Sequence, residues 1–407
     1  MTARTRTPWF IGTIAAVLYF SEGLPYGFIN DLLPIYLRMQ GVPLHEIALL
    51  STVGSAWIFK VLWSPLVDLA GTYRRWIITS VAIMIMLLVA LTALPIGIGP
   101  LFWAVVTLLA LASATQDLAV DAFTIRTTPA PLVGPVNSIR VTAYRVALIA
   151  AGSGLAWIAG RAGWPSAFGA AAALAGVTLV TAFAMPHDRG DRATREPLLT
   201  GLVRWLARPQ AVHLLALVFL YRLGEFAVLP MIKPYWVDRG YSPAEIGAIT
   251  STVGTTVSVI GAIAGGAFVA RFGIWRGLLW LGLAQTVSNL GYALTATSGA
   301  GRWAIYAASI AENAGYGLGT AAFLALLMAI CDRERAATEY ALLTAAFGLS
   351  RSLIGSASGF LAERAGYAGY FWITVALGIP GLLLLPLLRD RLAEPALPIA
   401  SEPALEG

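Results

Sequence analysis

Apolar stretches of about 20 residues, each long enough to cross a bilayer as a helix, recur along the whole chain. Charged residues or Pro and Gly separate them. Twelve such stretches are found: 9–30, 46–67, 76–95, 101–125, 138–160, 164–185, 211–233, 245–270, 277–297, 303–331, 337–362 and 367–388. Hydrophobic residues make up 58% of the chain and charged residues only 12%, which is outside the range of soluble globular domains. We therefore predict an all-α membrane protein with twelve transmembrane helices.

A long polar connection near the middle of the chain separates six predicted helices from six more. The halves also resemble each other, because "GVPLHEIALLSTVG" in the first half reappears as "GYSPAEIGAITSTVG" in the second. Such a repeat indicates a duplicated six-helix unit. The predicted domains are an N-terminal six-helix bundle at 1–185, a cytoplasmic linker at 186–210, a C-terminal six-helix bundle at 211–391 and a disordered cytoplasmic tail at 392–407.

Basic residues alternate between loops in a way that predicts the orientation of the chain. The N-terminus and the even-numbered loops hold 16 arginines, whereas the odd-numbered loops hold five. By the positive-inside rule both termini lie in the cytoplasm, as expected of a multi-pass protein of the bacterial inner membrane. The basic start "MTARTRTPWF" is not followed by a cleavage site, so we predict a retained first helix. Because the net charge of +6 is spread over loops and not gathered on one patch, nucleic acid is not an expected partner.

The sequence does not favour metal, redox or nucleophilic chemistry. Cys331 is the only cysteine, so an internal disulfide is excluded, and His45, His187 and His213 lack the spacing of metal ligands. The stretch "GSASG" places Ala357 where a nucleophile elbow requires serine. We therefore predict no cofactor, no metal site and no enzymatic activity, with an intramembrane enzyme kept as a remote alternative.

The candidate intramembrane acids are Glu22, Asp117, Asp121, Glu225 and Glu312. A charge at the centre of a spanning helix costs roughly 2.5–3.5 kcal/mol on insertion scales, so such residues usually face a cavity or a partner. Several intramembrane acids and bases in one bundle are therefore difficult to explain by packing. We predict that they line a transport pathway.

The pair Asp117 and Asp121 lies one helical turn apart in "SATQDLAVDAF", on one face of a helix. Counting residues from the helix ends suggests that Asp117 meets Arg145, with Lys60 at the depth of Asp121. Two acids on one face disfavour simultaneous ionisation, which suits a proton carrier. The structural alternative is a set of buried ion pairs that holds the N-terminal bundle together.

The second half carries polar residues of another kind. Arg222 and Glu225 share one helical face, and Arg351 lies midway along the eleventh span. A hydrogen-bonding stripe is formed by Gln285, Asn289 and Tyr292, and Glu312 and Asn313 precede glycines 315, 317 and 319. Tyr26 and Trp57 in the first half are candidates for stacking on sugar rings. The alternatives are interhelical hydrogen bonds for the polar residues and lipid-facing or core positions for the aromatic ones. Glycine pairs are assigned to helix packing, namely Gly23/Gly27, Gly261/Gly265, Gly315/Gly319 and Gly355/Gly359.

These segments together resemble the AmpG-type muropeptide permeases, a branch of the major facilitator superfamily related to acetyl-coenzyme A transporters. The resemblance runs from about Phe20 to Arg391 and rests on "SEGLPYG", "STVGSAWIFKVLWSPLVD", "SATQDLAVDAF", "LYRLGEFA", "QTVSNLGY", "ENAGYGLGTAAFLALLMAIC" and "ATEYALLTA". The first even loop also resembles a degenerate form of the superfamily's gating-loop motif, with Asp68, Arg74 and Arg75. An ordinary positive-inside loop is the alternative.

The resemblance implies a secondary transporter that carries cell-wall muropeptides, disaccharides of N-acetylglucosamine and anhydro-N-acetylmuramic acid with or without a peptide, into the cytoplasm with protons. It implies proton coupling by Asp117 and Asp121, to which we add Glu22. The predicted substrate contacts are Lys60, Arg145, Arg222, Glu225, Gln285, Asn289, Tyr292, Glu312, Asn313, Arg351, Tyr26 and Trp57. Glu225 stands where other members carry Asp. A monomer in the lipid bilayer is expected, and the alternative substrate is another large anionic metabolite such as acetyl-coenzyme A or a siderophore.

Overall fold

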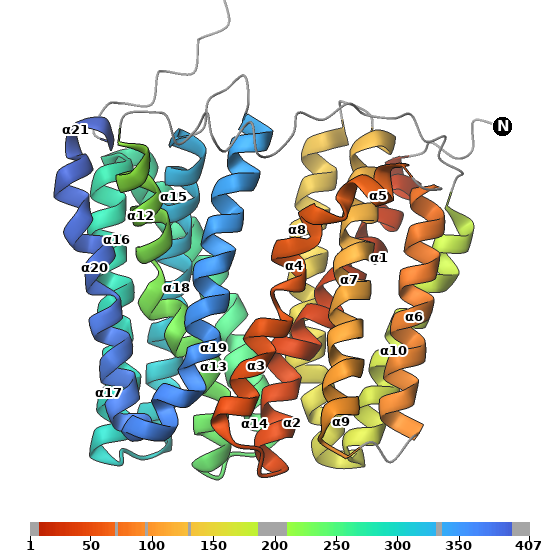
Figure 1. The fold of residues 1–407 in the computed structure, drawn as a ribbon, viewed down its shortest axis with the longest axis horizontal. Coiled ribbons are helices and arrows are strands. Elements are labelled where there is room, and N and C mark those ends of the chain that lie inside the picture. Colours follow the sequence, from red (N-terminus) through yellow and green to blue (C-terminus); the bar gives the residue numbers. More distant parts are fainter. Residues whose placement is uncertain are drawn as a thin grey trace, which may run out of the picture. The chain divides into compact units, whose positions relative to one another are not determined.

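The computed structural model describes residues 8–69, 72–93, 97–128, 132–185, 210–330 and 336–392, and the regular elements within these ranges are all helices (Figure 1). Nearly all of the predicted linker at 186–210 and of the predicted tail at 392–407 lies outside the described residues. The described helices fall into two compact units, each of which is treated by itself.

Unit 1 draws on the residues of Met1–Arg195, Leu229–Thr255 and Gly355–Glu363. Its first-half elements are α1 (Pro8–Gly27), η2 (Phe28–Leu32), α2 (Leu33–Met39), α3 (Leu44–Val53), α4 (Ala56–Phe59), η3 (Lys60–Leu62), α5 (Ser64–Leu69), α6 (Tyr73–Ala93), α7 (Pro100–Thr127), α8 (Val133–Ile149), η5 (Ala150–Gly154), α9 (Leu155–Ala162) and α10 (Trp164–Ala184). Within this unit α1 packs along α8, and α6 packs against both α7 and α10. Two short segments of the second half, which the sequence assigns to the C-terminal bundle, pack with these helices.

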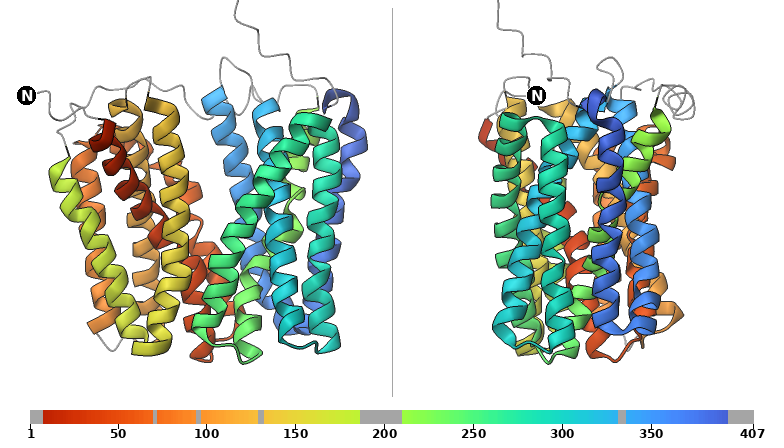
Figure 2. Two further views of the ribbon diagram at one scale, coloured as in Figure 1. Left: turned by 180° about the vertical axis from the view of Figure 1, so that it is seen from behind. Right: turned by 90° about the vertical axis from the view of Figure 1, so that its left-hand side faces the viewer.

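Unit 2 holds the residues of Glu196–Val228, Thr256–Ile354 and Arg364–Gly407. The second half of the chain forms α12 (Ala211–Leu220), α13 (Leu223–Asp238), α14 (Pro243–Ile246), η6 (Gly247–Val253), α15 (Gly254–Phe272), α16 (Ile274–Ser288), α17 (Leu290–Ser298), α18 (Arg302–Ile330), α19 (Ala336–Leu377), α20 (Ile379–Leu384), η8 (Leu385–Leu388) and α21 (Arg389–Leu392). The helix axis breaks inside α19 at Gly366, whose φ of 65° suits glycine. Two further views show the helices of each unit running side by side (Figure 2).

The second predicted helix, at 46–67, is wrong as a single regular element. The chain there forms α3, α4, the 3₁₀ turn η3 and α5. Gly54 and Ser55 interrupt the helix after α3, and Trp63 interrupts it after η3. The first interruption coincides with glycine, a weak helix former, and a short 3₁₀ turn within a helix often marks a functional hinge. Lys60 is the first residue of that turn.

Three π-helical turns, η2, η5 and η6, pack against one another inside unit 1. Gly152 in η5 is required there, because a Cβ at that position would overlap the side chain of Ser251 in η6. Ser153 donates a hydrogen bond of 2.5 Å to the carbonyl oxygen of Gly247 and contacts the hydroxyl of Thr252 at 2.6 Å. The close approach therefore depends on small residues in both halves of the sequence.

The glycine pairs assigned to packing are confirmed as close-approach positions. A Cβ at Gly261 would lie 2.7 Å from the carbonyl oxygen of Ala314, and one at Gly265 would lie 2.8 Å from that of Leu318. The other three pairs meet a neighbouring helix in the same way. Small residues allow the backbones of membrane helices to approach closely, and dispersion contacts then stabilise the bundle.

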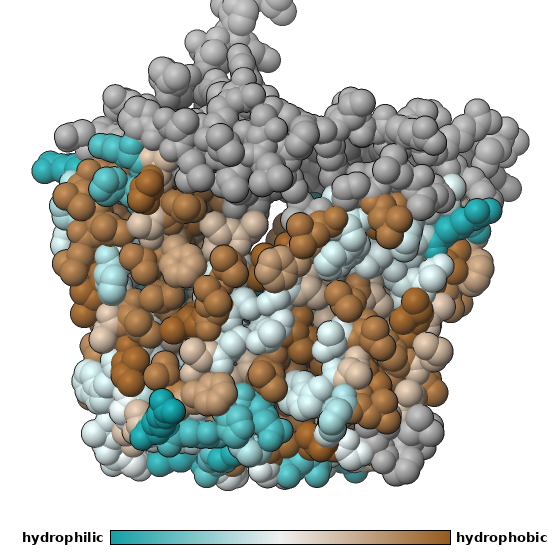
Figure 3. All heavy atoms as spheres, viewed as in Figure 1, coloured by the Kyte–Doolittle hydropathy of each residue, from teal (hydrophilic) through white to brown (hydrophobic). Residues whose placement is uncertain are grey.

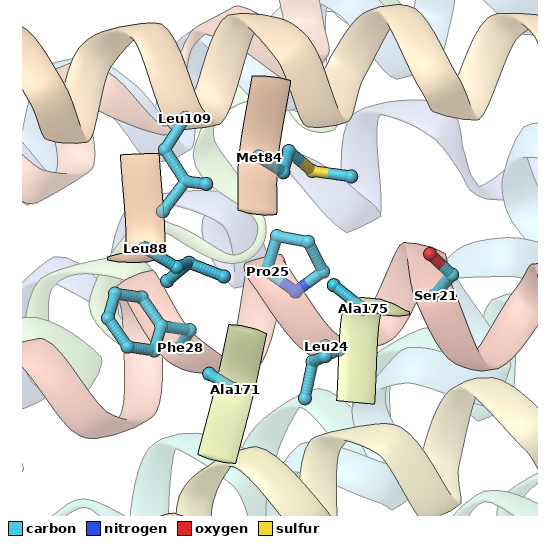
Figure 4. A pocket seen from close by; sticks show the side chains of 9 residues that line it. All are labelled: Ser21, Leu24, Pro25, Phe28, Met84, Leu88, Leu109, Ala171 and Ala175. Carbon is cyan, nitrogen blue, oxygen red and sulfur yellow. The ribbon is translucent and has the colours of Figure 1, made fainter. Parts of the chain in front are cut away.

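A small cavity between α1, α6, α7 and α10 shows the apolar packing of unit 1 (Figure 4). Eight of its nine lining side chains are apolar, and Ser21 is the polar one. Pro25 lies in the last turn of α1, where it lacks the N–H that would bond to the carbonyl of Ser21. An apolar lining of this kind does not suit a polar substrate, so the candidate site is sought among the buried polar residues.

Eight helical runs in the described residues are long and apolar enough to cross a membrane: Tyr73–Thr92, Pro100–Thr124, Ser138–Ala162, Trp164–Ala184, Ala211–Asp238, Pro243–Phe272, Arg302–Ile330 and Leu343–Leu388. The last run contains the break at Gly366 and spans most of two of the predicted helices. Apolar residues cover most of the visible helix surfaces, and hydrophilic residues gather mainly at the helix ends (Figure 3). The chain is thus a multi-pass membrane protein.

Candidate functional site

Asp117, on α7, forms an ion pair with Lys60 inside unit 1. The side chains are only 16% and 24% exposed, respectively. The break in the second helix places Lys60 in the turn η3, which packs against α7. A partly buried ion pair of this kind is disrupted at high cost when one partner is removed, because the other charge is left without compensation.

Asp121, one turn further along α7, has a different cation. Arg140 on α8 approaches its carboxylate to 3.2 Å, and Tyr19 on α1 donates a hydrogen bond of 3.0 Å to it. The guanidinium of Arg140 also lies 4.7 Å from the centroid of the Tyr19 ring. Each aspartate of α7 is thus matched with its own basic residue.

Glu22, on α1, joins the first of these pairs. Its side chain is buried, with 5% exposed, and its carboxyl group lies next to that of Asp117. Two carboxylates have only acceptors, so the two groups can share a hydrogen bond only when one of them is protonated. We call the five side chains Glu22, Lys60, Asp117, Asp121 and Arg140 the paired cluster. It becomes electrically neutral when it holds one proton.

The predicted contact between Asp117 and Arg145 is wrong, because Asp117 pairs with Lys60. Residues 140 and 145 are five apart on α8, so their side chains point about 140° away from each other around the helix. Arg145 therefore cannot face α7 together with Arg140. Lys60, which was predicted at the depth of Asp121, pairs with the aspartate one turn away.

Arg140 and Tyr19 are absent from the predicted site. The sequence places the start of the fifth span at residue 138, whereas α8 begins at Val133. With the correct start, Arg140 lies seven residues from the end of its helix and Asp121 six residues from the end of α7, which is nearly the same depth. A count from the true helix ends would have paired them.

Glu225 on α13 and Glu312 on α18 meet in unit 2. Each is 2% exposed, and their carboxyl groups lie next to each other. Gln285 on α16 donates a hydrogen bond of 3.1 Å to Glu225, and Asn313 donates one of 2.9 Å to Glu312. We call Glu225 and Glu312 the carboxyl pair. Four residues of the predicted second-half site are thus brought together.

Arg222 lies next to the carboxyl pair in sequence but engages other groups. It is 2% exposed, and one terminal N–H₂ group donates a hydrogen bond of 2.8 Å to Thr320. Its guanidinium lies 4.6 Å from the ring centroid of Tyr316. Its Nε and its other terminal nitrogen are buried without a hydrogen-bond partner in the described part of the chain. These donors fit a carboxylate or phosphate group of a ligand.

The remaining predicted residues of unit 2 have varied surroundings. Asn289 is 1% exposed, and its Oδ1 has no hydrogen-bond partner within the described ranges. Tyr292 is fully buried, with its ring centroid 5.4 Å from that of Phe371. Arg351 lies on α19 and is half-buried. The stripe predicted from Gln285 to Tyr292 therefore changes along its length from polar contacts to aromatic packing.

The aromatic candidates of the first half lie together in unit 1. The ring centroids of Tyr26 and Trp57 are 5.3 Å apart in an edge-to-face arrangement, and Tyr144 lies 6.3 Å from Tyr26. Of the predicted gating loop, Arg74 donates hydrogen bonds of 3.0 and 2.6 Å to the last carbonyl groups of α10. Arg75 is exposed, and the side chain of Asp68 lies outside the described residues.

A second set of polar contacts in unit 1 joins η2 and α2 to the last turns of α13. Arg38 and Asp238 form a two-fold contact, with both N–O distances 2.6 Å. Lys233 forms an ion pair with Asp31. These pairs were not predicted from the sequence, although the repeat places Arg38 and Asp238 just before the matching glycines of the two halves.

Comparison with known families and proteins gives consistent matches along the chain. The family model of the Major Facilitator Superfamily matches residues 15–353 and, in a second match, 214–405. The anhydromuropeptide permease of Escherichia coli K12 is 30% identical over 392 residues, which cover 93% of this chain and 80% of that protein. The putative transporter AmpG 4 of Rickettsia felis is 24% identical and covers 92% of this chain and 95% of its own length.

Solved structures share the fold at low sequence identity. A POT family transporter in complex with a thioalcohol-conjugated peptide superposes with a TM-score of 0.75 at 10% identity, covering 94% of this chain and 96% of that chain. A D-xylose-proton symporter gives a TM-score of 0.72 at 15% identity, covering 92% of this chain and 96% of that chain.

Proposed function

Because this chain belongs to the Major Facilitator Superfamily and, within it, to the family of the Escherichia coli anhydromuropeptide permease, we propose that it imports anhydro-muropeptides into the cytoplasm together with protons. In this proposal it is a twelve-helix protein of the bacterial inner membrane with both termini in the cytoplasm. The two duplicated halves rock around a central substrate site, as in other transporters built from repeats.

The observation that carries the proposal is the contact of Glu22, Asp117 and Lys60 in the paired cluster. A proton held between two carboxyl groups beside a lysine can be exchanged when the lysine moves. With Lys60 close, its charge balances one carboxylate of the cluster. When η3 carries Lys60 away, uptake of a proton by the cluster restores the balance. Since η3 is a 3₁₀ turn between helix breaks, it is a suitable place for that movement.

The substrate contacts that we propose follow from the chemistry of a muropeptide. Its carboxylate groups suit Arg222, whose free donors are aimed at no other group in the described chain. Its sugar rings suit the aromatic surfaces of Tyr26 and Trp57. The other candidate contacts, to be tested by substitution with the most buried first, are Lys60, Arg145, Arg351, Gln285, Asn289, Tyr292 and Asn313.

The alternative substrate is another large anionic metabolite, such as acetyl-coenzyme A or a siderophore. Arg222 favours it equally, since a guanidinium binds phosphate as well as carboxylate. Counterflow in proteoliposomes decides between them, with a panel of anhydro-muropeptides, acetyl-coenzyme A and ferric siderophores. Our assignment is supported if labelled muropeptide is exchanged and neither acetyl-coenzyme A nor siderophores inhibit this exchange. It is contradicted if acetyl-coenzyme A or a siderophore is exchanged and muropeptide is not.

The proposed topology is tested by labelling of single cysteines. In a background with Cys331 replaced by Ser, cysteines at positions 276 and 239 are exposed to a membrane-impermeant maleimide in intact cells. Our proposal places Arg276 in an even-numbered loop and Arg239 in an odd-numbered one, so only the second should be labelled. Labelling of both positions from outside would contradict the twelve-helix arrangement.

A further inference from the structure

The carboxyl pair of unit 2 is not used in the proposed function. Glu225 and Glu312 are each 2% exposed, and their carboxyl groups lie next to each other. An ionised carboxylate has acceptors only, so the two groups can share a hydrogen bond only when one of them is protonated. None of the residues of the paired cluster lies in unit 2, so a proton held here would be separate from one held by Glu22 and Asp117.

The charges around the carboxyl pair also favour one bound proton. The cation beside Glu225 is Arg222, which lies one residue before α13. Two ionised glutamates beside one arginine would leave a net negative charge among buried groups, which is costly in a medium of low dielectric constant. One bound proton makes the set neutral.

The neighbouring uncharged groups tolerate both protonation states. Gln285 from α16 and Asn313 from α18 each donate an N–H to one glutamate oxygen. Such a donor can bond either to a carboxylate or to the carbonyl oxygen of a carboxylic acid. A Cβ at Gly319 would overlap the end of the Gln285 side chain, so glycine at that position keeps this donor in place.

We propose that Glu225 and Glu312 form a second proton-binding site, which holds one proton between two carboxyl groups and is coupled to the substrate through Arg222. The free guanidinium of Arg222 favours loss of the proton. When an anionic group of the substrate binds Arg222, this influence weakens and the pair keeps its proton. The proton and the anion therefore bind cooperatively and cross the membrane together, and the coupling is reciprocal. The coupling to substrate, but not the existence of the site, rests on the proposed function.

Infrared difference spectroscopy tests the site without any substrate. Purified protein in nanodiscs is taken from acid to alkaline buffer, and the C=O stretching band of protonated carboxyl groups is recorded. We expect the pair to give a band that is lost in both Glu225→Gln and Glu312→Gln. Asp117→Asn should keep this band and lose a different one. A band unchanged in both glutamine variants would overturn the proposal.

Gly319→Ala provides a second variant in case a glutamine variant does not fold. Its methyl group displaces the flexible end of Gln285, so both acids remain while one of their hydrogen bonds is lost. The carboxyl band should shift in frequency and persist. Gly176→Ala is the matched control, because a Cβ there meets no atom within 4 Å. An identical band in Gly319→Ala and in the wild type would contradict the assignment.

Proton-flux measurements then test the coupling. In proteoliposomes that accumulate labelled muropeptide, the number of protons taken up per substrate should fall by one in Glu225→Gln. An unchanged ratio would overturn the coupling to substrate. If muropeptide is not transported by the wild type, the proposed function fails, whereas the infrared result still decides whether the second proton site exists.

Discussion

Both units contain acidic and basic side chains that are largely shielded from solvent, but these side chains are paired differently. In unit 1 the aspartates of α7 are each matched with a cation, Lys60 for Asp117 and Arg140 for Asp121. In unit 2 the two glutamates contact each other, and Arg222 binds Thr320 and the ring of Tyr316 in their place. Acids and a base near one another in sequence thus do not necessarily form ion pairs.

The difference indicates that the two clusters have different roles in transport. A carboxylate that is paired with a cation changes its affinity for protons when the cation moves, so the paired cluster suits a conformational switch. A cation with unpartnered donors is available to an anionic ligand, so Arg222 suits substrate binding. The following experiments test this contrast.

The largest effect is expected from Asp117→Asn. It removes the acid that Glu22 and Lys60 share, so uptake driven by a proton gradient should fall to background. Removing one partner of a buried ion pair also destabilises by about 3–5 kcal/mol, so the melting temperature should fall. Both quantities are measured on protein purified in detergent and in proteoliposomes, with counterflow as the reference for transport that needs no net proton movement.

A double variant separates coupling from stability. Asp117→Asn with Lys60→Gln leaves no uncompensated charge, so the melting temperature should recover while gradient-driven uptake stays at background. Recovery of both would show that the ion pair is structural only.

Arg222→Gln should produce the next largest effect. Hydrogen bonds to a charged group contribute roughly 1.5–3 kcal/mol, so the apparent Kd for the substrate should rise about 10- to 100-fold while the amount of protein in the membrane is unchanged. Arg161→Gln is the matched control, because Arg161 is exposed and stacks on Trp157 at 4.5 Å. Equal affinities of the two variants would remove Arg222 from the site.

Arg140→Gln should have a smaller effect than Asp117→Asn. Arg140 and Asp121 are 43% and 30% exposed, so solvent screens their attraction and the pair contributes about 1 kcal/mol or less. Gradient-driven uptake should fall about fivefold or less. A complete loss would mean that Asp121, not Asp117, dominates the coupling.

The smallest effect on transport is expected from an ion pair that lies outside both clusters. Arg38→Gln removes the contact with Asp238, in which the side chains are 23% and 28% exposed. Neither residue belongs to the paired cluster or to the carboxyl pair, so the uptake rate should change little. An effect as large as that of Asp117→Asn would show that this end of unit 1 controls the transport cycle.

The sequence by itself determined the membrane class, the helical fold, the family and the acids of the two clusters. These features follow from the number of apolar residues needed to cross a bilayer and from the cost of a charge inside it. Both can be counted along the chain without knowing how helices pack. The glycine pairs were predicted for the same reason, since a small residue on a membrane helix indicates close approach.

Only the tertiary structure decided which groups meet. Asp117 and Arg145 lie at compatible depths, but direction around α8 selects Arg140 for the acids of α7, and the break before Lys60 brings that residue to Asp117. Asp31 meets Lys233 although some 200 positions separate them in the sequence. Depth is set by position along one helix, whereas a contact also requires the rotation of each helix about its axis, and that is fixed by packing against all the others.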